Sequence, residues 1–156
     1  MKSYLQLFVF LFIFTSCSKN ESTCLNSDSN FDPQTEEDII KYIEDNDLNA
    51  NRTSSGLYYV IDNSGSGNRP TSSSNVTVAY KGYFLDGSVF DQSDASGISF
   101  GLNQVISGWT EGIPLFKGGG NGILLIPSNL GYGSRGSCSI PRDAVLVFDI
   151  KLISVN

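Results

Sequence analysis

Two segments in which apolar and polar residues alternate constrain the fold of this chain most strongly. One runs over residues 76–85 and the other over residues 145–155. One face of the first carries Val76, Val78, Tyr80, Gly82 and Phe84, and one face of the second carries Leu146, Phe148, Ile150 and Leu152. A period of two predicts β-strands that bury one face. We therefore expect each strand to bury that face.

The remaining apolar runs are short and are separated by turn residues. Further strands are predicted at residues 57–61, 88–91 and 123–126. The pair Asp86-Gly87 is typical of a tight hairpin. A helix that opens at Gly108 is kept short by Pro114 and by the glycines at 118–120. Strands with hairpin-length links and one short helix predict the α+β class, with an antiparallel β-sheet around one short α-helix.

An extra helix is predicted before the sheet, in an N-terminal helical extension of residues 35–53. Thr35 is a suitable N-cap, and the three carboxylates that follow it favour the positive end of the helix dipole. The apolar stripe of this helix consists of Ile39, Ile40 and Ile43. The mainly polar segment 46–51 ends it.

The first sixteen residues are typical of an export signal, and we do not expect them to belong to the fold. A basic start precedes the apolar run 4–14, which is too short to span a hydrocarbon core of about 30 Å. The tetrapeptide Phe14-Thr15-Ser16-Cys17 resembles the lipobox of bacterial lipoproteins, whose cysteine is lipid-modified and becomes the first mature residue. This resemblance predicts a signal peptide of residues 1–16 and a lipidated Cys17. The alternative is an ordinary secretory signal beside an incidental cysteine.

Residues 17–34 are rich in Ser, Asn and Asp, and they are predicted to form a flexible tether. With Cys17 acylated, Cys24 and Cys138 are the two remaining thiols of the chain. An exported compartment permits disulfides. A Cys24–Cys138 bridge between tether and domain is therefore one prediction, and two unpaired thiols are the other.

The composition excludes several kinds of chemistry. The chain contains no histidine, and its three cysteines form no C-x-x-C motif. Histidine-containing zinc sites, thiolate zinc ribbons and iron–sulfur clusters are therefore excluded. The net charge of −6 argues against nucleic acid as a partner, because phosphate binding needs a basic surface. We expect no metal and no other cofactor.

Four motif blocks, in order along the chain, resemble those of the FKBP-type peptidyl-prolyl cis-trans isomerases. The blocks are residues 78–83 with 86–93, residues 100–112, residues 126–133, and Ile140-Pro141 with residues 146–149. The likeness covers about residues 54–156, which we expect to form the isomerase domain. It implies an antiparallel sheet wrapped around one short helix, in agreement with the strand pattern.

The resemblance also implies an activity, that of a rotamase, which needs neither a nucleophile nor a metal. Rotation about an X–Pro bond crosses a barrier of about 18–20 kcal/mol without breaking a bond, so a pocket that favours the twisted amide is sufficient. By resemblance, the catalytic residues are Tyr80, Asp91, Tyr132 and Phe148. The substrate-binding residues are Phe90, Phe100, Val105, Ile106, Trp109 and Ile140.

Within this implied site, Trp109 is the floor of the pocket. The Ile106 backbone N–H and the Tyr132 hydroxyl hold substrate carbonyls, and Asp91 is the polar group nearest the twisting amide. The loop at residues 133–139 departs from the family, because it is short and lacks the imidazole or proline that is common there. This departure bears on substrate preference more than on activity.

The implied partners are proline-containing polypeptides, and the implied location is the cell envelope. We expect a monomer that the lipid on Cys17 holds to the outer membrane, facing the periplasm or the cell surface. Two other functions remain open. One is a non-catalytic binder of proline-containing partners, and the other is a structural subunit of an envelope machine, such as a gliding or secretion assembly. A hydrolase that pairs Asp91 with Asp94 or Glu111 has no further support in the sequence.

Overall fold

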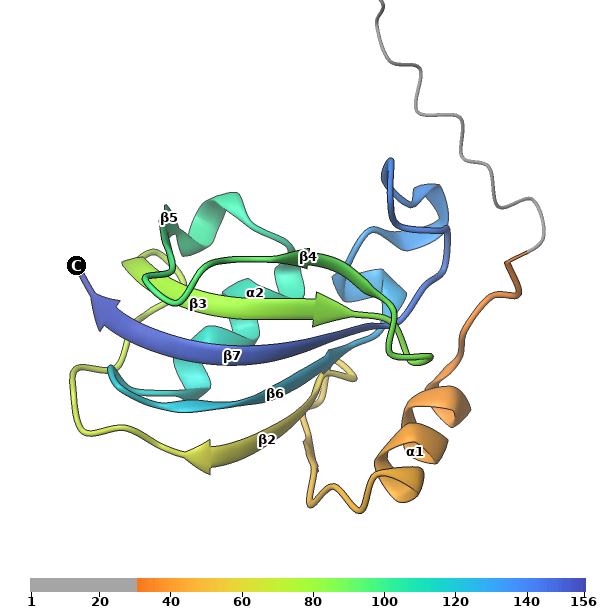
Figure 1. Cartoon of the computed structure of the whole chain (residues 1–156), viewed down its shortest axis with the longest axis horizontal. Coiled ribbons are helices and arrows are strands. Elements are labelled where there is room, and N and C mark those ends of the chain that lie inside the picture. Colours follow the sequence, from red (N-terminus) through yellow and green to blue (C-terminus); the bar gives the residue numbers. More distant parts are fainter. Residues whose placement is uncertain (1–30) are drawn as a thin grey trace, which may run out of the picture.

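An antiparallel sheet of seven strands dominates the computed structural model, which describes residues 31–156 (Figure 1). The strands are β1 (Asn51–Arg52), β2 (Tyr58–Asn63), β3 (Asn75–Tyr83), β4 (Val89–Gln92), β5 (Ile98–Gly101), β6 (Asn121–Ile126) and β7 (Leu146–Val155). Their order across the sheet is β1-β2-β6-β7-β3-β4, and β5 also pairs with β3. The predicted signal peptide, Cys17 and Cys24 lie outside the described residues.

Two α-helices accompany the sheet, α1 (Glu36–Asp45) and α2 (Ser107–Gly112). Short 3₁₀ segments occur at Leu102–Gln104, Ile113–Leu115, Ser128–Leu130 and Gly133–Arg135. The predicted fold class, an antiparallel sheet with one short helix and an extra N-terminal helix, is confirmed. Within residues 31–156, none of the helices is long and apolar enough to cross a bilayer.

The two alternating segments form the central strand pair of the sheet, β3 and β7. The opposed residues include Val78 with Leu152, Tyr80 with Ile150 and Gly82 with Phe148. Opposed residues of an antiparallel pair share a face. The apolar faces predicted for the two strands therefore coincide.

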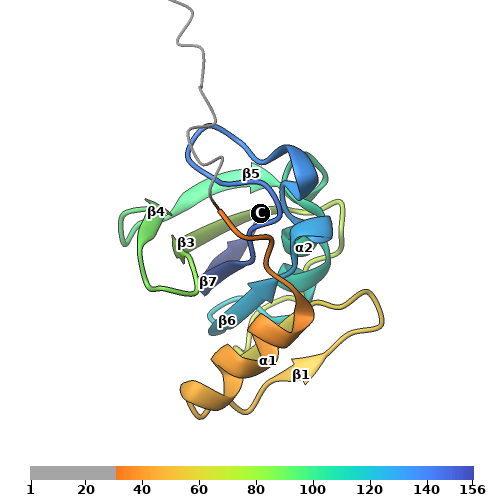
Figure 2. The same cartoon turned by 90° about the vertical axis from the view of Figure 1, so that its right-hand side faces the viewer.

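The sheet buries residues on both of its faces. Successive residues of a strand point to opposite faces. On β6, Leu124 belongs to the main core with Trp109 of α2, whereas Leu125 packs with Ile39 of α1 and Val147. Figures 1 and 2 show α1 outside the sheet, beside the ends of β2 and β6 and away from α2. The two helices thus cover different faces.

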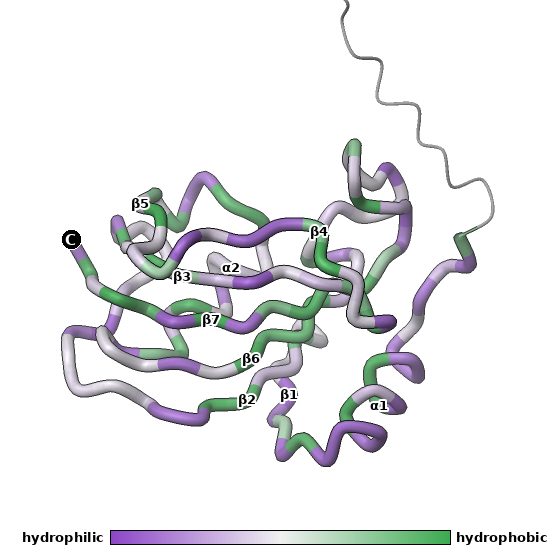
Figure 3. The backbone as a smooth tube through the Cα atoms, viewed as in Figure 1, coloured by the Kyte–Doolittle hydropathy of each residue, from purple (hydrophilic) through white to green (hydrophobic). Residues whose placement is uncertain are grey.

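This double coverage explains why β6 reads as an unbroken apolar run. Leu124, Leu125 and Ile126 are all fully buried. Figure 3 shows the hydrophobic colour along this part of β6. Strands that are buried on both faces lose the alternation of half-buried strands.

α1 begins at the predicted residue, but the face that it buries is narrower than the predicted apolar stripe. Thr35 is the N-cap, and its backbone N–H donates to Asp38 Oδ2 at 2.7 Å. Ile39 is fully buried and Ile43 packs beside it, whereas Ile40 is 42% exposed. The inclusion of Ile40 in the apolar stripe is therefore wrong, because neighbouring residues on a helix point about 100° apart.

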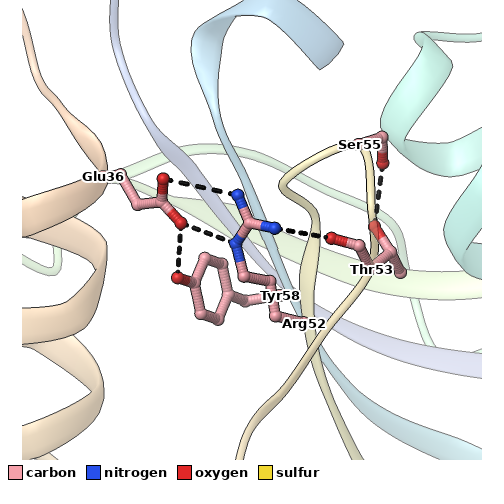
Figure 4. A network of polar contacts seen from close by, with 5 residues as sticks. All are labelled: Glu36, Arg52, Thr53, Ser55 and Tyr58. Atoms are coloured by element: carbon pink, nitrogen blue, oxygen red, sulfur yellow. Dashed lines mark hydrogen bonds and ion pairs between the residues drawn. The ribbon is translucent and has the colours of Figure 1, made fainter.

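A polar network joins α1 to β1 and β2 (Figure 4). Arg52 Nε and Nη2 donate to the two carboxylate oxygens of Glu36, at 2.6 and 3.4 Å, and the Tyr58 hydroxyl donates to the first of them at 2.6 Å. The hydrogen bonds from Arg52 and then from Tyr58 hold the pKa of Glu36 below its ordinary value. Because the ion pair is exposed, it orients β1 against the helix more than it stabilises the fold.

Candidate active site

A pocket of about 720 Å³ opens beside α2 and the central strands. All ten residues that the sequence analysis assigns to the site line it: Tyr80, Phe90, Asp91, Phe100, Val105, Ile106, Trp109, Tyr132, Ile140 and Phe148. They come from strands β3, β4, β5 and β7, from α2 and from the adjoining loops. The structure thus brings the whole set together, and the role of each residue stays a prediction.

Trp109, the predicted floor of the pocket, packs against three other aromatic rings of the lining. It is 6% exposed, and the ring centroids of Tyr80, Phe148 and Phe100 lie 5.0, 5.2 and 5.3 Å from its own. Tyr80 and Phe148 meet it edge to face, at 81° and 79°, which the quadrupoles of aromatic rings favour. The indole Nε1 has no hydrogen-bond partner among the described residues. Ring packing therefore positions the floor.

Two glycines let α2 lie close against the sheet. A Cβ atom at Gly108 would lie 2.5 Å from Ile126, and a Cβ atom at Gly112 would lie 2.6 Å from Leu124. Larger residues at these positions would push the helix away from β6. Trp109 would then move with it, so these glycines determine the depth of the pocket.

On β3, Gly82 leaves room for two side walls of the pocket. A Cβ atom there would lie 2.7 Å from the rings of both Phe90 and Phe148. The two rings meet at 88°, with their centroids 5.5 Å apart. The glycine within the alternating pattern of β3 thus allows two aromatic side chains to meet over the strand.

Asp91 and two tyrosines form a polar corner of the pocket. The Tyr80 hydroxyl donates to Asp91 Oδ2 at 2.6 Å. Burial, followed by this hydrogen bond, raises the pKa of Tyr80 far above its ordinary value, and burial, followed by the charge of Asp91, raises the pKa of Tyr132. Both hydroxyls are therefore protonated at neutral pH. Asp91 forms no ion pair within residues 31–156.

Two hydrogen-bond donors at the pocket have no acceptor in the described part of the chain. One is the Tyr132 hydroxyl, on a residue that is 40% exposed, and the other is the backbone N–H of Ile106. Ile106 is the N-cap of α2, and its carbonyl accepts the N–H groups of Trp109 and Thr110 at 2.9 and 3.1 Å. These bonds fix the orientation of the Ile106–Ser107 peptide, which follows that N–H in the chain. Carbonyl oxygens of a bound polypeptide can satisfy both donors.

The pocket also has lining residues that the sequence analysis does not assign to the site. They are Gln104, Ser137 and Ser139, in addition to Ile98, which the family resemblance places close to the pocket. The two serines lie in the loop after Tyr132, where Ser137 and Ile140 exchange two backbone hydrogen bonds of 2.8 Å. The family resemblance predicts that this loop affects substrate preference, but its irregular sequence has no periodicity that could assign Ser137 and Ser139 to the lining.

Cys138 lies between the two serines and is disulfide-bonded. It is the one cysteine within residues 31–156, so its partner lies outside the described residues. The pairing of Cys138 with Cys24 remains a prediction.

The carboxylates that could pair with Asp91 for hydrolysis are engaged elsewhere. Asp94 accepts a hydrogen bond from Ser96 in its own loop, and Glu111 accepts one from Ser55. In the described part of the chain, no three metal-binding side chains gather into a cluster. The site instead offers aromatic rings around a space with hydrogen-bond donors at its edge. Such a space suits a proline ring with its flanking carbonyls.

Comparisons with known proteins agree with this geometry. The family described as FKBP-type peptidyl-prolyl cis-trans isomerase matches residues 67–153. A probable FKBP-type peptidyl-prolyl cis-trans isomerase, FkpA, from Neisseria meningitidis is 49% identical over 107 residues, which cover 67% of this chain and 39% of that protein. The chain thus spans about two fifths of the length of the curated relatives that it matches.

Solved structures show the same similarity. The crystal structure of FkpA from Escherichia coli superposes with a TM-score of 0.71 at 37% identity, covering 77% of this chain and 58% of that one. A peptidyl-prolyl cis-trans isomerase from Pseudomonas syringae pv. tomato superposes with a TM-score of 0.69 at 31% identity. The superposition covers 81% of this chain and 98% of that one. Sheet, helix and aromatic pocket together define a domain of the proline-isomerase class. The chain belongs to the FKBP-type peptidyl-prolyl cis-trans isomerase family, as the motif blocks predict.

Proposed function

We propose that this chain catalyses the cis–trans isomerisation of X–Pro peptide bonds in exported polypeptides. The observation that carries the proposal is the pocket itself, in which aromatic rings surround Trp109 and the donors of Tyr132 and Ile106 have no acceptor among residues 31–156. Membership of an isomerase family supports the same activity.

The reaction requires only that the twisted amide be bound more tightly than either planar form. Amide resonance keeps the bond planar, behind a barrier of about 18–20 kcal/mol. Tighter binding of the twisted state lowers that barrier, whereas equal binding of all states does not. A pocket that excludes water also strengthens each electrostatic contact made inside it.

In this proposal the proline ring lies over Trp109, between the walls formed by Phe90 and Phe148. These rings hold the pyrrolidine by packing, while the remainder of the amide rotates. The edge-to-face contacts among the rings keep the walls in place during rotation.

The polar groups act on the amide and on its neighbours. The Tyr132 hydroxyl and the Ile106 N–H donate to carbonyl oxygens of the polypeptide. Asp91, oriented by Tyr80, lies beside the rotating amide. Loss of resonance leaves more positive charge on the carbonyl carbon, and the carboxylate stabilises that charge.

A peptide assay tests this function. Full-length protein in detergent should accelerate the cis-to-trans relaxation of a short X–Pro peptide with an apolar X, without metal or nucleotide. A heat-denatured sample is the control. Peptide binding without acceleration would contradict catalysis and favour the non-catalytic binder instead.

We further propose that residues 1–16 are a signal peptide, that Cys17 carries the lipid, and that residues 17–34 tether the domain to the outer membrane. The lipobox-like Phe14-Thr15-Ser16-Cys17 and the polar composition of the tether support this placement. In this proposal a monomer faces the periplasm or the cell surface and acts on proline-containing polypeptides there. The alternative of a structural subunit in an envelope assembly predicts no isomerase activity.

A further inference from the structure

The turn that carries two pocket-lining serines is attached to a disulfide. Ser137 and Ser139 line the pocket, and Cys138 between them is disulfide-bonded. The two backbone hydrogen bonds between Ser137 and Ile140 place Cys138 and Ser139 at the tip of a two-residue turn. A displacement of the Cys138 sulfur therefore displaces both serines.

The described residues supply few other restraints on this turn. The hydroxyls of Ser137 and Ser139 form no hydrogen bond within residues 31–156, and both residues are exposed. Gly133 and Gly136, at the start of the loop, have φ angles of 59° and 63°, which glycine adopts without strain. The restraint applied at Cys138 is therefore important for the position of the serines.

The N-terminal segment runs along the base of the same loop. The Gln34 N–H donates to the Asp143 carbonyl at 3.0 Å, and Gln34 Oε1 accepts the Val145 N–H at 2.8 Å. The Asp143 N–H in turn donates to the Gly133 carbonyl at 2.9 Å. Phe31 packs against the main core. The chain upstream of the domain thus starts beside the pocket loop.

Cys24 is close enough along the chain to reach the tip of this loop. Seven positions separate Cys24 from Phe31, and an extended chain spans about 3.3–3.6 Å per residue, or about 25 Å in all. Cys138, at the tip, is only five residues along the chain from both Gly133 and Asp143 at the base of the loop, where Gln34 binds. The tip therefore lies within reach of the segment that precedes Phe31. The other cysteine, Cys17, is the proposed lipid site, so its thiol is not available.

We propose that a Cys24–Cys138 disulfide makes Cys138 a positioning residue, which holds Ser137 and Ser139 at the pocket rim and thereby sets the affinity for polypeptide. The proposal rests on the proposed function for the identity of the ligand. A restrained turn has already lost conformational entropy that a free turn would lose on binding, so the bond favours binding. Trp109 lies on α2, and the Tyr80–Asp91 pair lies on β3 and β4, all outside this turn. The rotation step of bound substrate therefore changes little.

The affinity then depends on the redox state of the envelope. A dithiol reductant attacks the S–S bond as a thiolate, and its second thiolate resolves the mixed disulfide. The two protein sulfurs gain two electrons and become thiols, while the dithiol is oxidised to its own disulfide. The oxidising space of exported proteins favours the bonded, high-affinity state.

The test uses full-length protein in detergent, purified without reductant. Peptide mapping by mass spectrometry under non-reducing conditions should find Cys24 joined to Cys138. Trp109 is the one tryptophan of the chain, so its fluorescence reports peptide binding at the pocket floor independently of activity. Far-UV circular dichroism reports the fold.

Four samples should show the same loss of peptide affinity relative to the untreated wild-type protein. They are dithiothreitol-reduced protein, Cys24→Ser, Cys138→Ser and the double variant. Each should bind an X–Pro peptide about three- to tenfold more weakly, because the turn must then be ordered on binding. KM should rise by the same factor, with kcat within about twofold of wild type. Ser134→Ala, in the same loop but outside the pocket lining, is the matched control and should bind as the wild type does.

Unchanged peptide affinity after complete reduction would overturn the proposal, and so would a Cys17–Cys138 cross-link. Equal losses of kcat and of circular dichroism signal would also overturn it, since they would indicate a general structural role. A reduction-dependent change of peptide affinity in protein without isomerase activity would support the positioning role and contradict only the proposed catalysis.

Discussion

The Tyr80 hydroxyl lies 2.6 Å from Asp91 Oδ2, so that β3 holds a carboxylate of β4 at the wall of a pocket that apolar side chains mainly line. The ring of the same tyrosine packs edge to face on Trp109, with the centroids 5.0 Å apart. Tyr80 thus links the polar corner to the floor.

Replacement of Asp91 by alanine should lower kcat/KM about ten- to hundredfold, since a polar contact with a charged group contributes about 1.5–3 kcal/mol. The protein should stay folded, because Asp91 is exposed and fills no part of the core. Peptide kinetics and circular dichroism measure the two effects. Asp62→Ala, which removes an exposed carboxylate on β2, is the control. Unchanged turnover in Asp91→Ala would remove this residue from the site.

Isomerase activity should be constant between about pH 6 and 9.5. The chain has no histidine, and the pKa values of Tyr80 and Tyr132 both lie above the ordinary value of 10.0. Because these pKa values are raised, both hydroxyls stay protonated over the tested range. The stability that the two tyrosines contribute is complete below the pKa of the unfolded chain and is lost only as the pH rises through the pKa of the folded protein. A bell-shaped profile of kcat/KM near neutrality would contradict this expectation.

Gly82→Ala should reduce stability and activity together. The added methyl group would lie 2.7 Å from the rings of Phe90 and Phe148, so at least one wall of the pocket must move. Overpacking of this kind costs about 1–3 kcal/mol, which urea unfolding can measure. The control is Gly118→Ala, whose Cβ would find its nearest neighbour at 3.5 Å. Equal stability of the two variants would show that the walls adapt without cost.

Ile39→Ala should lower the free energy of unfolding by about 2–4 kcal/mol, because this side chain is fully buried between α1 and the sheet. The kcat/KM of the folded variant should not change, since α1 covers the face opposite to the pocket. Ile40→Ala, on the neighbouring exposed position, should change stability by less than about 0.5 kcal/mol. Reduced kcat/KM in fully folded Ile39→Ala would instead reveal coupling between α1 and the site.

Cys17→Ala should abolish lipid labelling and membrane association of the full-length protein expressed in a bacterium. The thiol of Cys17 is the proposed attachment point, and no other residue could replace it at the end of the signal. Cys24→Ala should still be labelled, which makes it the matched control. Wild-type mature protein found wholly in the soluble fraction would rule out the lipid anchor.

Features that depend on near neighbours in the chain were predictable from the sequence. The alternation in β3 and β7 reflects one buried face on each strand, and it predicted both strands and the face that each of them buries. Thr35 and the carboxylates after it predicted the start of α1. The ordered motif blocks predicted the family and the set of residues that the structure gathers around one pocket.

Features that depend on register and packing were decided only by the tertiary structure. The polar pair Asn51–Arg52 becomes β1 because the edge of β2 lies beside it, and no local pattern predicts that pairing. Ser137 and Ser139 reach the pocket through the path of an irregular loop. Gly82 has its role only because Phe90 and Phe148 arrive from two other strands. A local pattern records which face of a strand or helix is buried, but contacts between distant segments arise only when the sheet has formed.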